Sequence, residues 1–139
     1  MILNFLNRYR DFGLLILRIG IGIMFIIHGA PKLFGGPDKW IAVGGAMKFL
    51  GLDFWPGFWG FMAAGSEFLG GLFLILGFLF RPAAFFMMFT MIVATIFHFG
   101  RGDGLQAASH PMEAGILFLS LILIGPGKYS LDALLCKKR

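Results

Sequence analysis

Apolar residues in this chain of 139 residues form four long runs, which polar or glycine-rich segments separate. The runs cover about residues 14–33, 58–80, 82–99 and 111–126. A helix of about 20 apolar residues is long enough to cross the hydrocarbon core of a bilayer. The pattern therefore predicts four transmembrane helices, which belong to a single integral membrane domain of residues 1–139.

A shorter apolar segment of about residues 39–50 separates the first two runs and is too short to span a bilayer. Asp38 is a favourable N-cap before this segment, and Gly51 is a favourable helix end after it. Trp and Lys residues accompany the segment, as is typical of helices that lie along a membrane surface. We therefore expect a short interfacial helix between the first and second spans.

Proline and capping residues indicate where the later spans begin. Arg81-Pro82 is expected to form a two-residue turn, with Pro82 in the first position of the third span. Ser109 or His110 is expected to cap the fourth span, and Glu113 then lies in its first turn, where the helix dipole favours a negative charge. The predicted fold class is all-α: a four-helix transmembrane bundle with one short interfacial helix.

Composition supports a membrane protein and argues against a nucleic-acid-binding protein. Hydrophobic residues make up 58% of the chain and charged residues 14%, where a soluble domain has about 25% charged residues. The net charge is +5, but the Lys and Arg residues lie between and beyond the apolar runs and form no contiguous basic face. We therefore expect these cations to contact anionic lipid headgroups and expect no nucleic-acid partner.

The distribution of basic residues predicts the orientation of the bundle. Four spans place both termini and the turn near residue 81 on one side, which carries seven Lys and Arg residues against four on the other side. The seven are Arg8, Arg10, Arg81, Lys128, Lys137, Lys138 and Arg139, and the four are Lys32, Lys39, Lys48 and Arg101. The positive-inside rule then predicts that both termini are cytoplasmic.

Ionisable residues inside or near the ends of the spans are the candidates for a functional site. Charge is costly in hydrocarbon, so such side chains usually face a bundle interior, a cavity or a partner charge. The candidates for ligand binding are Arg18, His28, Lys32, Glu67, His98 and Glu113. Glu67 is the candidate for a catalytic role, although no residue is assigned one firmly.

Helical periodicity places several of these candidates on shared faces. At 100° per residue, one face of the first span carries Arg18, Gly22, Phe25, Gly29 and Lys32, with His28 beside it. In the second span, small residues surround Glu67 in a stripe that favours close helix packing. The stripe consists of Ala63, Gly70, Gly71 and Gly77. Glu67 is therefore expected to point into the bundle.

Each candidate also has a purely structural interpretation. Glu67 paired with Arg18, His28 or Lys32 could be an ion pair that holds the bundle together, and Lys32 could extend to the headgroups. His98 and His110 could be ordinary interfacial residues. No metal site is assigned, because no His-x-x-x-His or Glu-x-x-His spacing occurs. Met87, Met88 and Met91 are interpreted as packing residues, and the single cysteine, Cys136, excludes an intrachain disulfide.

Three stretches of the chain resemble the DoxX family in their order and spacing. They are Leu17-Arg18 with Gly20, Gly22, Phe25 and His28-Gly29-x-x-Lys32-Leu33-Phe34; Glu67-Phe68-Leu69-Gly70-Gly71-Leu72 with Leu76-Gly77-Phe78 and Arg81-x-Ala83-Ala84; and Gly125-Pro126-Gly127-Lys128-Tyr129-Ser130-Leu131-Asp132. The resemblance implies a four-helix protein of the bacterial inner membrane. Relatives are associated with thiosulfate:quinone oxidoreductase subunits and with membrane redox complexes that act in oxidative-stress defence.

The first functional hypothesis is therefore a subunit or module of a quinone-linked membrane redox system. In this hypothesis a quinone ring lies among Phe and Met side chains, His28 or Lys32 donates a hydrogen bond to it, and Glu67 exchanges the coupled proton. The chain has no haem, flavin or iron–sulfur motif, so a redox partner protein is expected to supply electrons. Whether the chain is itself an enzyme stays open.

Two other classes of function remain open alternatives. One is a non-enzymatic protein that binds a small molecule or scaffolds an assembly, with the polar residues as structural contacts. The other is a small proton-coupled transporter in which Glu67 carries the proton. Four spans without an inverted repeat argue against a monomeric transporter, whereas a homodimer could suffice.

Overall fold

The computed structural model describes residues 3–136, and all of its regular elements are helices. They are the 3₁₀ helix η1 (Asn4–Tyr9), α1 (Arg10–Leu33), α2 (Pro37–Gly44), the 3₁₀ helix η2 (Gly45–Leu50), α3 (Pro56–Leu76), α4 (Phe80–Arg101), α5 (Gly104–Ile124) and α6 (Leu131–Cys136). In this part of the chain, four helical stretches are long and apolar enough to cross a membrane: η1 with α1, then α3, α4 and α5. The predicted all-α fold with four spans is confirmed.

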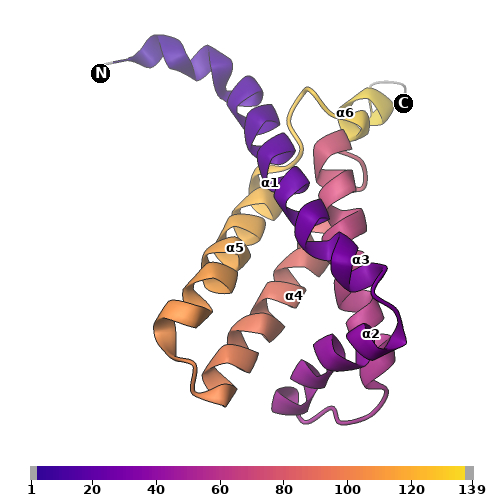
Figure 1. Ribbon diagram of the computed structural model, residues 1–139. Helices are drawn as coiled ribbons and strands as arrows, with labels where there is room; N and C mark the ends of the chain where they lie inside the picture. The colour runs from indigo at the N-terminus through magenta and orange to yellow at the C-terminus, as the bar shows by residue number, and fades with distance from the viewer. Residues whose placement is uncertain (1–2, 137–139) are drawn as a thin grey trace.

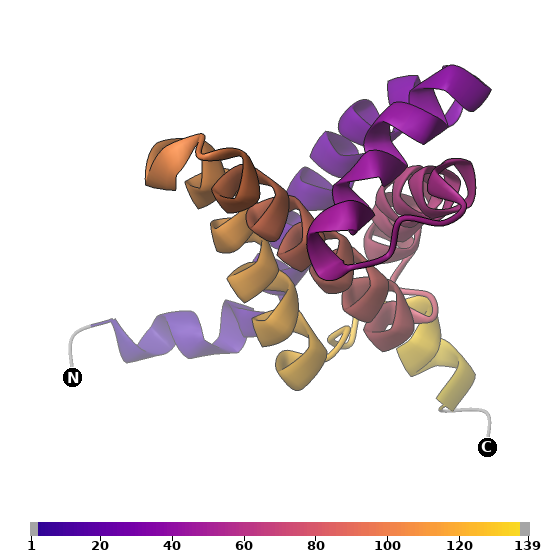
Figure 2. The same ribbon diagram turned by 90° about the horizontal axis from the view of Figure 1, so that it is seen from below.

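The spans pack in the order α1, α3, α4, α5, and α2 lies against α3. The N-terminal part of α1 and the short helix α6 lie at the same end of the bundle, here called the terminal end (Figure 1). The opposite end, with α2 and the α4–α5 connection, is the loop end. Figures 1 and 2 show that α1 and α5 cross near the terminal end and diverge towards the loop end. Which end faces the cytoplasm stays a prediction.

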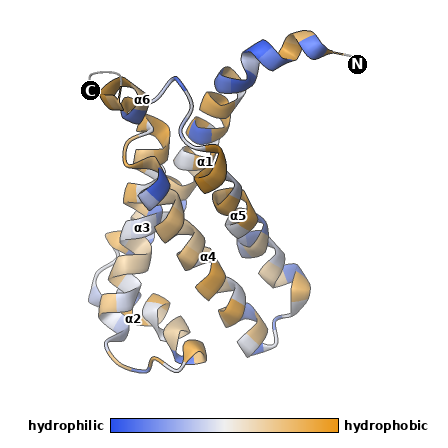
Figure 3. Ribbon diagram, turned by 180° about the vertical axis from the view of Figure 1, so that it is seen from behind, coloured by the Kyte–Doolittle hydropathy of each residue, from blue (hydrophilic) through white to orange (hydrophobic). Residues whose placement is uncertain are grey.

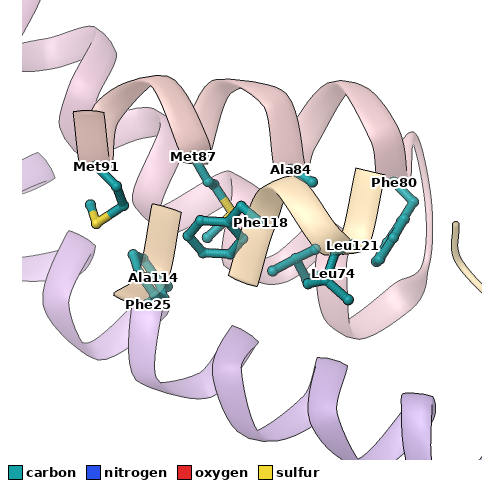
Figure 4. Close-up of a cluster of buried hydrophobic side chains, with 9 residues drawn as sticks. All are labelled: Phe25, Leu74, Phe80, Ala84, Met87, Met91, Ala114, Phe118 and Leu121. Carbon is teal, nitrogen blue, oxygen red and sulfur yellow. The ribbon is translucent and has the colours of Figure 1, made fainter. Parts of the chain in front are cut away.

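Hydrophobic side chains cover both the interior and the outer faces of the four spans. Figure 3 shows hydrophobic residues along the spans, with more hydrophilic residues in the N-terminal segment and connections. The interior cluster takes residues from all four spans (Figure 4). Its members are Phe25, Leu74, Phe80, Ala84, Met87, Met91, Ala114, Phe118 and Leu121. Outward-facing side chains such as Ile16 and Leu123 remain exposed, as lipid-facing residues should.

Glycines bring α1 and α3 into backbone contact. A Cβ atom on Gly22 would lie 2.6 Å from the carbonyl oxygen of Gly71, and one on Gly29 would lie 2.6 Å from the amide nitrogen of Phe68. Only glycine leaves room for such an approach of two membrane helices. Gly71 of the predicted small-residue stripe therefore packs on the predicted inner face of α1, whereas Gly70 packs against Met87 of α4; Gly29 lies beside Glu67.

The turn between α3 and α4 differs from the sequence prediction. Helix α3 ends at Leu76, and Gly77 follows with a positive φ of 63°. Helix α4 begins at Phe80, so Arg81-Pro82 lies in its first turn and does not form the connection. The carboxylate of Asp132 accepts hydrogen bonds from the amides of Leu79 and Phe80 and so caps α4. This cap comes from 52 residues away in the sequence, beyond the reach of local signals.

The start of the fourth span also differs. Helix α5 begins at Gly104, and Ser109 and His110 lie inside it. Pro111 is an interior residue, where its ring removes one helical hydrogen bond. Glu113 therefore lies in the third turn, and the dipole of the helix N-terminus does not account for it.

Smaller corrections concern the interfacial segment and the chain ends. The predicted helix of residues 39–50 is α2 followed by η2, and its N-cap is Gly36 with Pro37 first, in place of Asp38. Gly51 ends η2 with a positive φ, as predicted. Lys137, Lys138 and Arg139, which enter the orientation prediction, lie outside the described residues, as do Met1 and Ile2.

Candidate functional site

Arg18 is a structural clasp at the terminal end of the bundle. Arg18 is only 1% exposed. The guanidinium donates to the carbonyl oxygens of Leu74 and Ile75 in α3, both at 2.9 Å. It also donates to those of Pro126 at 2.7 Å and Tyr129 at 2.9 Å. Through these four hydrogen bonds, Arg18 holds the segment after α5 against α1 and α3. Its guanidinium forms no contact with Glu67 or His28, so Arg18 does not belong to a site with them.

Lys32 and Glu67 form an ion pair between α1 and α3. The ammonium nitrogen of Lys32 lies 2.9 Å from Oε1 and 2.7 Å from Oε2 of Glu67. The Glu67 side chain is 5% exposed and that of Lys32 33%, so the lysine covers the carboxylate on its open side. A buried carboxylate with a cation on both oxygens is satisfied within the chain. Of the three partners that the sequence suggested for Glu67, the structure pairs it with Lys32.

His98 lies at the loop end and takes part in the α4–α5 connection. Its Nδ1 atom is 2.9 Å from a carboxylate oxygen of Asp103, and Nε of Arg101 is 3.7 Å from the same oxygen. All three groups are partly or largely exposed. His98 is therefore a local contact of the connection, and the structure does not bring it together with the other candidates.

A cavity of about 330 Å³ lies between α1 and α5, on the side where the two helices diverge. Helix α1 contributes Ile21, Met24, Phe25 and His28, and α5 contributes His110, Glu113, Ala114 and Leu117. The imidazole rings of His28 and His110 lie near each other in its lining, with centroids 6.1 Å apart and ring planes tilted by 57°. Phe25 closes the inner wall through an edge contact with Phe118 at 4.9 Å. The cavity therefore has apolar walls and one polar end.

The polar end of this cavity contains side chains that have no partner in the protein. Among residues 3–136, the side chains of His28, His110 and Glu113 form no hydrogen bond or ion pair with another residue. Arg18 and Glu67, in contrast, are satisfied by groups of the chain itself. An ionisable group within a span needs a partner, water or a ligand. The α1–α5 cavity is therefore the candidate site.

Sequence reasoning found two of these three residues and missed His110. It assigned His110 to a helix cap, because it placed the start of the fourth span too late. A helix that includes residues 104–113 puts His110 and Glu113 three residues apart on one face. The His-x-x-Glu spacing is thus the signal that could have found it. Within residues 3–136, no three His, Cys, Asp or Glu side chains are arranged to hold a metal ion.

The fold and the cavity define a small multi-pass membrane protein with four membrane-spanning helices and a partly polar site between its first and last spans. The DoxX family model matches residues 13–100, and the chain belongs to the DoxX family. No solved structure matches the chain.

Two relatives of the chain are named as inner membrane proteins of a bacterium. The chain is 35% identical to "Inner membrane protein YqjF" of Escherichia coli (strain K12) over 138 residues, which cover 96% of this chain and 99% of that protein. It is 33% identical to "Inner membrane protein YphA" of the same organism, with 90% and 96% covered. A more distant relative is "Putative oxidoreductase CatD" of Bacillus subtilis (strain 168), 30% identical over 66% of this chain and 63% of that protein. The chain is thus a multi-pass protein of a bacterial inner membrane.

Proposed function

We propose that this DoxX-family protein is the membrane module of a quinone-linked redox system and that a quinone head group binds in the α1–α5 cavity. The observation that carries the proposal is the group of three unpartnered side chains, His28, His110 and Glu113, at one end of an apolar cavity. The name of the relative "Putative oxidoreductase CatD" supports a redox role.

The side chains of the cavity fit the chemistry of a quinone head group. A quinone supplies two-electron chemistry that is coupled to the uptake of two protons. Imidazole N–H groups of His28 and His110 can donate hydrogen bonds to two carbonyl oxygens, and the carboxyl group of Glu113 can exchange a proton with them. Phe25 and Met24 offer an aromatic and a polarizable surface for the ring.

This assignment moves the proton-exchanging role from Glu67 to Glu113. Glu67 is covered by Lys32, with both carboxylate oxygens within 3 Å of the ammonium nitrogen. A carboxylate that is bound in this way is poorly placed to accept a proton from a ligand. Glu113 is exposed and lines the cavity directly. Electrons are expected to arrive from a partner protein.

Ligand-dependent thermal stability in lipid nanodiscs tests the proposal. Ubiquinone and menaquinone analogues should stabilise the wild-type protein in a saturable way, by about 2.7 kcal/mol at a free concentration of 100 times Kd. Glu113→Gln and His110→Leu should raise Kd at least tenfold, which lowers the stabilisation at the same ligand concentration to about 1.4 kcal/mol or less. His98→Leu is the matched control, because His98 is bonded to Asp103 and lies outside the cavity. Absence of stabilisation by every quinone would refute the proposal.

A scaffold is the second candidate function, and the Arg18 clasp favours it. Arg18 and the Lys32–Glu67 pair use buried charges only to hold helices of the same chain together. If the protein is a scaffold, neither wild type nor Glu113→Gln should respond to quinones, and Glu113→Gln should alter the association with partner proteins. A pull-down from membranes with wild type and Glu113→Gln, compared by mass spectrometry, separates this outcome from ligand binding.

A further inference from the structure

We infer that the ligand of the α1–α5 cavity enters sideways from the bilayer, so that the site takes a lipid-dissolved amphiphile with a hydrogen-bonding head and a hydrocarbon tail. This inference rests on the proposed function, because both use the same cavity. It adds the route of entry and the requirement for a tail. The competing hypothesis is that a water-soluble ligand enters from the loop end.

The edges of the cavity show where it opens. On the inner side, Phe25 is buried and meets Phe118, which closes the cavity towards the core. On the outer side, the apolar part of the cavity opens beside Met24, which is 50% exposed, while the polar end is also exposed at His28, His110 and Glu113. Ile23 and Ile27, the neighbours of Met24 on the outward face of α1, are also exposed. In a bilayer these side chains contact lipid, so the opening beside Met24 faces hydrocarbon.

The depth of Met24 supports entry from lipid. Met24 lies nine residues before the end of α1 at Leu33. At about 1.5 Å per residue, it is roughly 13 Å from that end, which is close to the middle of a hydrocarbon core about 30 Å thick. Water is scarce at this depth. A molecule that passes Met24 therefore comes from the bilayer interior.

The polarity of the cavity follows the direction in which an amphiphile lies in a leaflet. His28 is one helical turn closer to the loop end than Met24, and His110 is two turns closer to that end than Leu117. The polar end thus lies nearer the membrane surface, and the apolar end lies nearer the bilayer centre. A head group bound at the histidines would leave its tail beside Ile21, Met24 and Leu117.

A second cavity, between α4 and α5, supports this choice of site by contrast. Its volume is about 300 Å³, and it is lined by apolar side chains together with Thr95. Met88, Ile92 and Ile116 are among them, and no charged or imidazole side chain lines it. That cavity can accommodate a hydrocarbon chain but offers no ionic or imidazole contact to a head group. Selection of an amphiphile by its head therefore requires the α1–α5 cavity.

Spin-label accessibility tests the route without any assumption about quinones. In a Cys136→Ser background, single nitroxide labels are placed at Met24→Cys and Leu117→Cys in proteoliposomes, with Lys39→Cys as the water-exposed control. Collisions with oxygen, which concentrates in lipid, are compared with those with a water-soluble nickel chelate. Lateral entry predicts a ratio of oxygen to nickel accessibility at least tenfold higher at 24 and 117 than at 39. Equal ratios would show a water-filled cavity and overturn the inference.

Narrowing the opening provides the second arm. Met24→Trp should slow the association of decylubiquinone at least tenfold, whereas Ile23→Trp, a lipid-facing neighbour that does not line the cavity, should leave it unchanged. Equal rates in both variants would overturn lateral entry while leaving the proposed function intact. If no quinone binds to wild type, the proposed function fails, and the accessibility ratios still decide whether the cavity opens to lipid.

Discussion

The contact between Gly22 of α1 and Gly71 of α3 can be tested with a single added methyl group. In Gly22→Ala, the new Cβ atom would lie 2.6 Å from the carbonyl oxygen of Gly71 and 2.6 Å from Cγ1 of Ile75. Carbon atoms do not approach a backbone oxygen that closely, so the two helices must separate by several tenths of an ångström. Gly20→Ala is the matched control, because nothing lies within 4 Å of its added Cβ atom.

The size of the effect follows from two opposing terms. Forcing an extra carbon into a close-packed interface costs about 1–3 kcal/mol. Replacing glycine by alanine inside a helix gains up to about 1 kcal/mol, and this gain applies to both variants. The difference in unfolding free energy between Gly22→Ala and Gly20→Ala is therefore the packing cost alone. We expect this difference to be about 2 kcal/mol. The ratio of folded to unfolded protein is then roughly 30-fold lower for Gly22→Ala than for Gly20→Ala.

Reversible unfolding in mixed micelles with increasing dodecyl sulfate measures this difference. Gly20→Ala should unfold at or above the wild-type midpoint, and Gly22→Ala should unfold clearly below it. Helix content before the transition should be the same in all three proteins, since the change affects packing between helices. Equal midpoints for the two variants would show that α1 and α3 do not meet at these glycines, and the reasoning about their backbone contact would be refuted.

Three further predictions concern the polar contacts. Arg18→Met should destabilise the protein by about 3 kcal/mol or more in the same unfolding assay, because four carbonyl oxygens lose the hydrogen bond from the guanidinium. Arg81→Met, which removes one exposed hydrogen bond, should change stability by less than about 1 kcal/mol. Lys32→Met should cost about 3 kcal/mol by leaving the Glu67 carboxylate unpaired, and adding Glu67→Gln should recover part of it; additive effects would contradict a direct pair. Asp132→Ala should weaken the α4 cap by about 1 kcal/mol, seen as faster hydrogen exchange at its first amides.

Periodicity predicted the α1–α3 interface well. The face with Arg18, Gly22, Phe25 and Gly29 contains the buried residues of α1. A helix has a fixed angle per residue, so local sequence determines which residues share a face. The high cost of charge in lipid then made a partner for Glu67 a sound expectation, and Lys32 provides it.

The remaining features depend on contacts between segments far apart in the chain. Asp132 caps a helix that begins 52 residues earlier, so the α3–α4 turn needs no Arg81-Pro82 signal of its own. Arg18 finds its acceptors in the last turn of α3 and in the segment after α5, where carbonyl groups are not fully used by helical hydrogen bonds. No pattern near Arg18 identifies these acceptors, which is why the sequence suggested a carboxylate partner for it.

The position of the site follows from where the chain satisfies its own polar groups. At the terminal end, the Arg18 clasp joins α1, α3 and the segment after α5. Between α1 and α3, glycine contacts and the Lys32–Glu67 pair leave no room and no free charge. Among residues 3–136, no hydrogen bond or ion pair joins α1 to α5. Their interface contains the Phe25–Phe118 contact and the cavity with its unpartnered side chains. A bundle that is fixed at its terminal end and along the α1–α3 interface can bind a ligand between α1 and α5 without losing the contacts that hold it together.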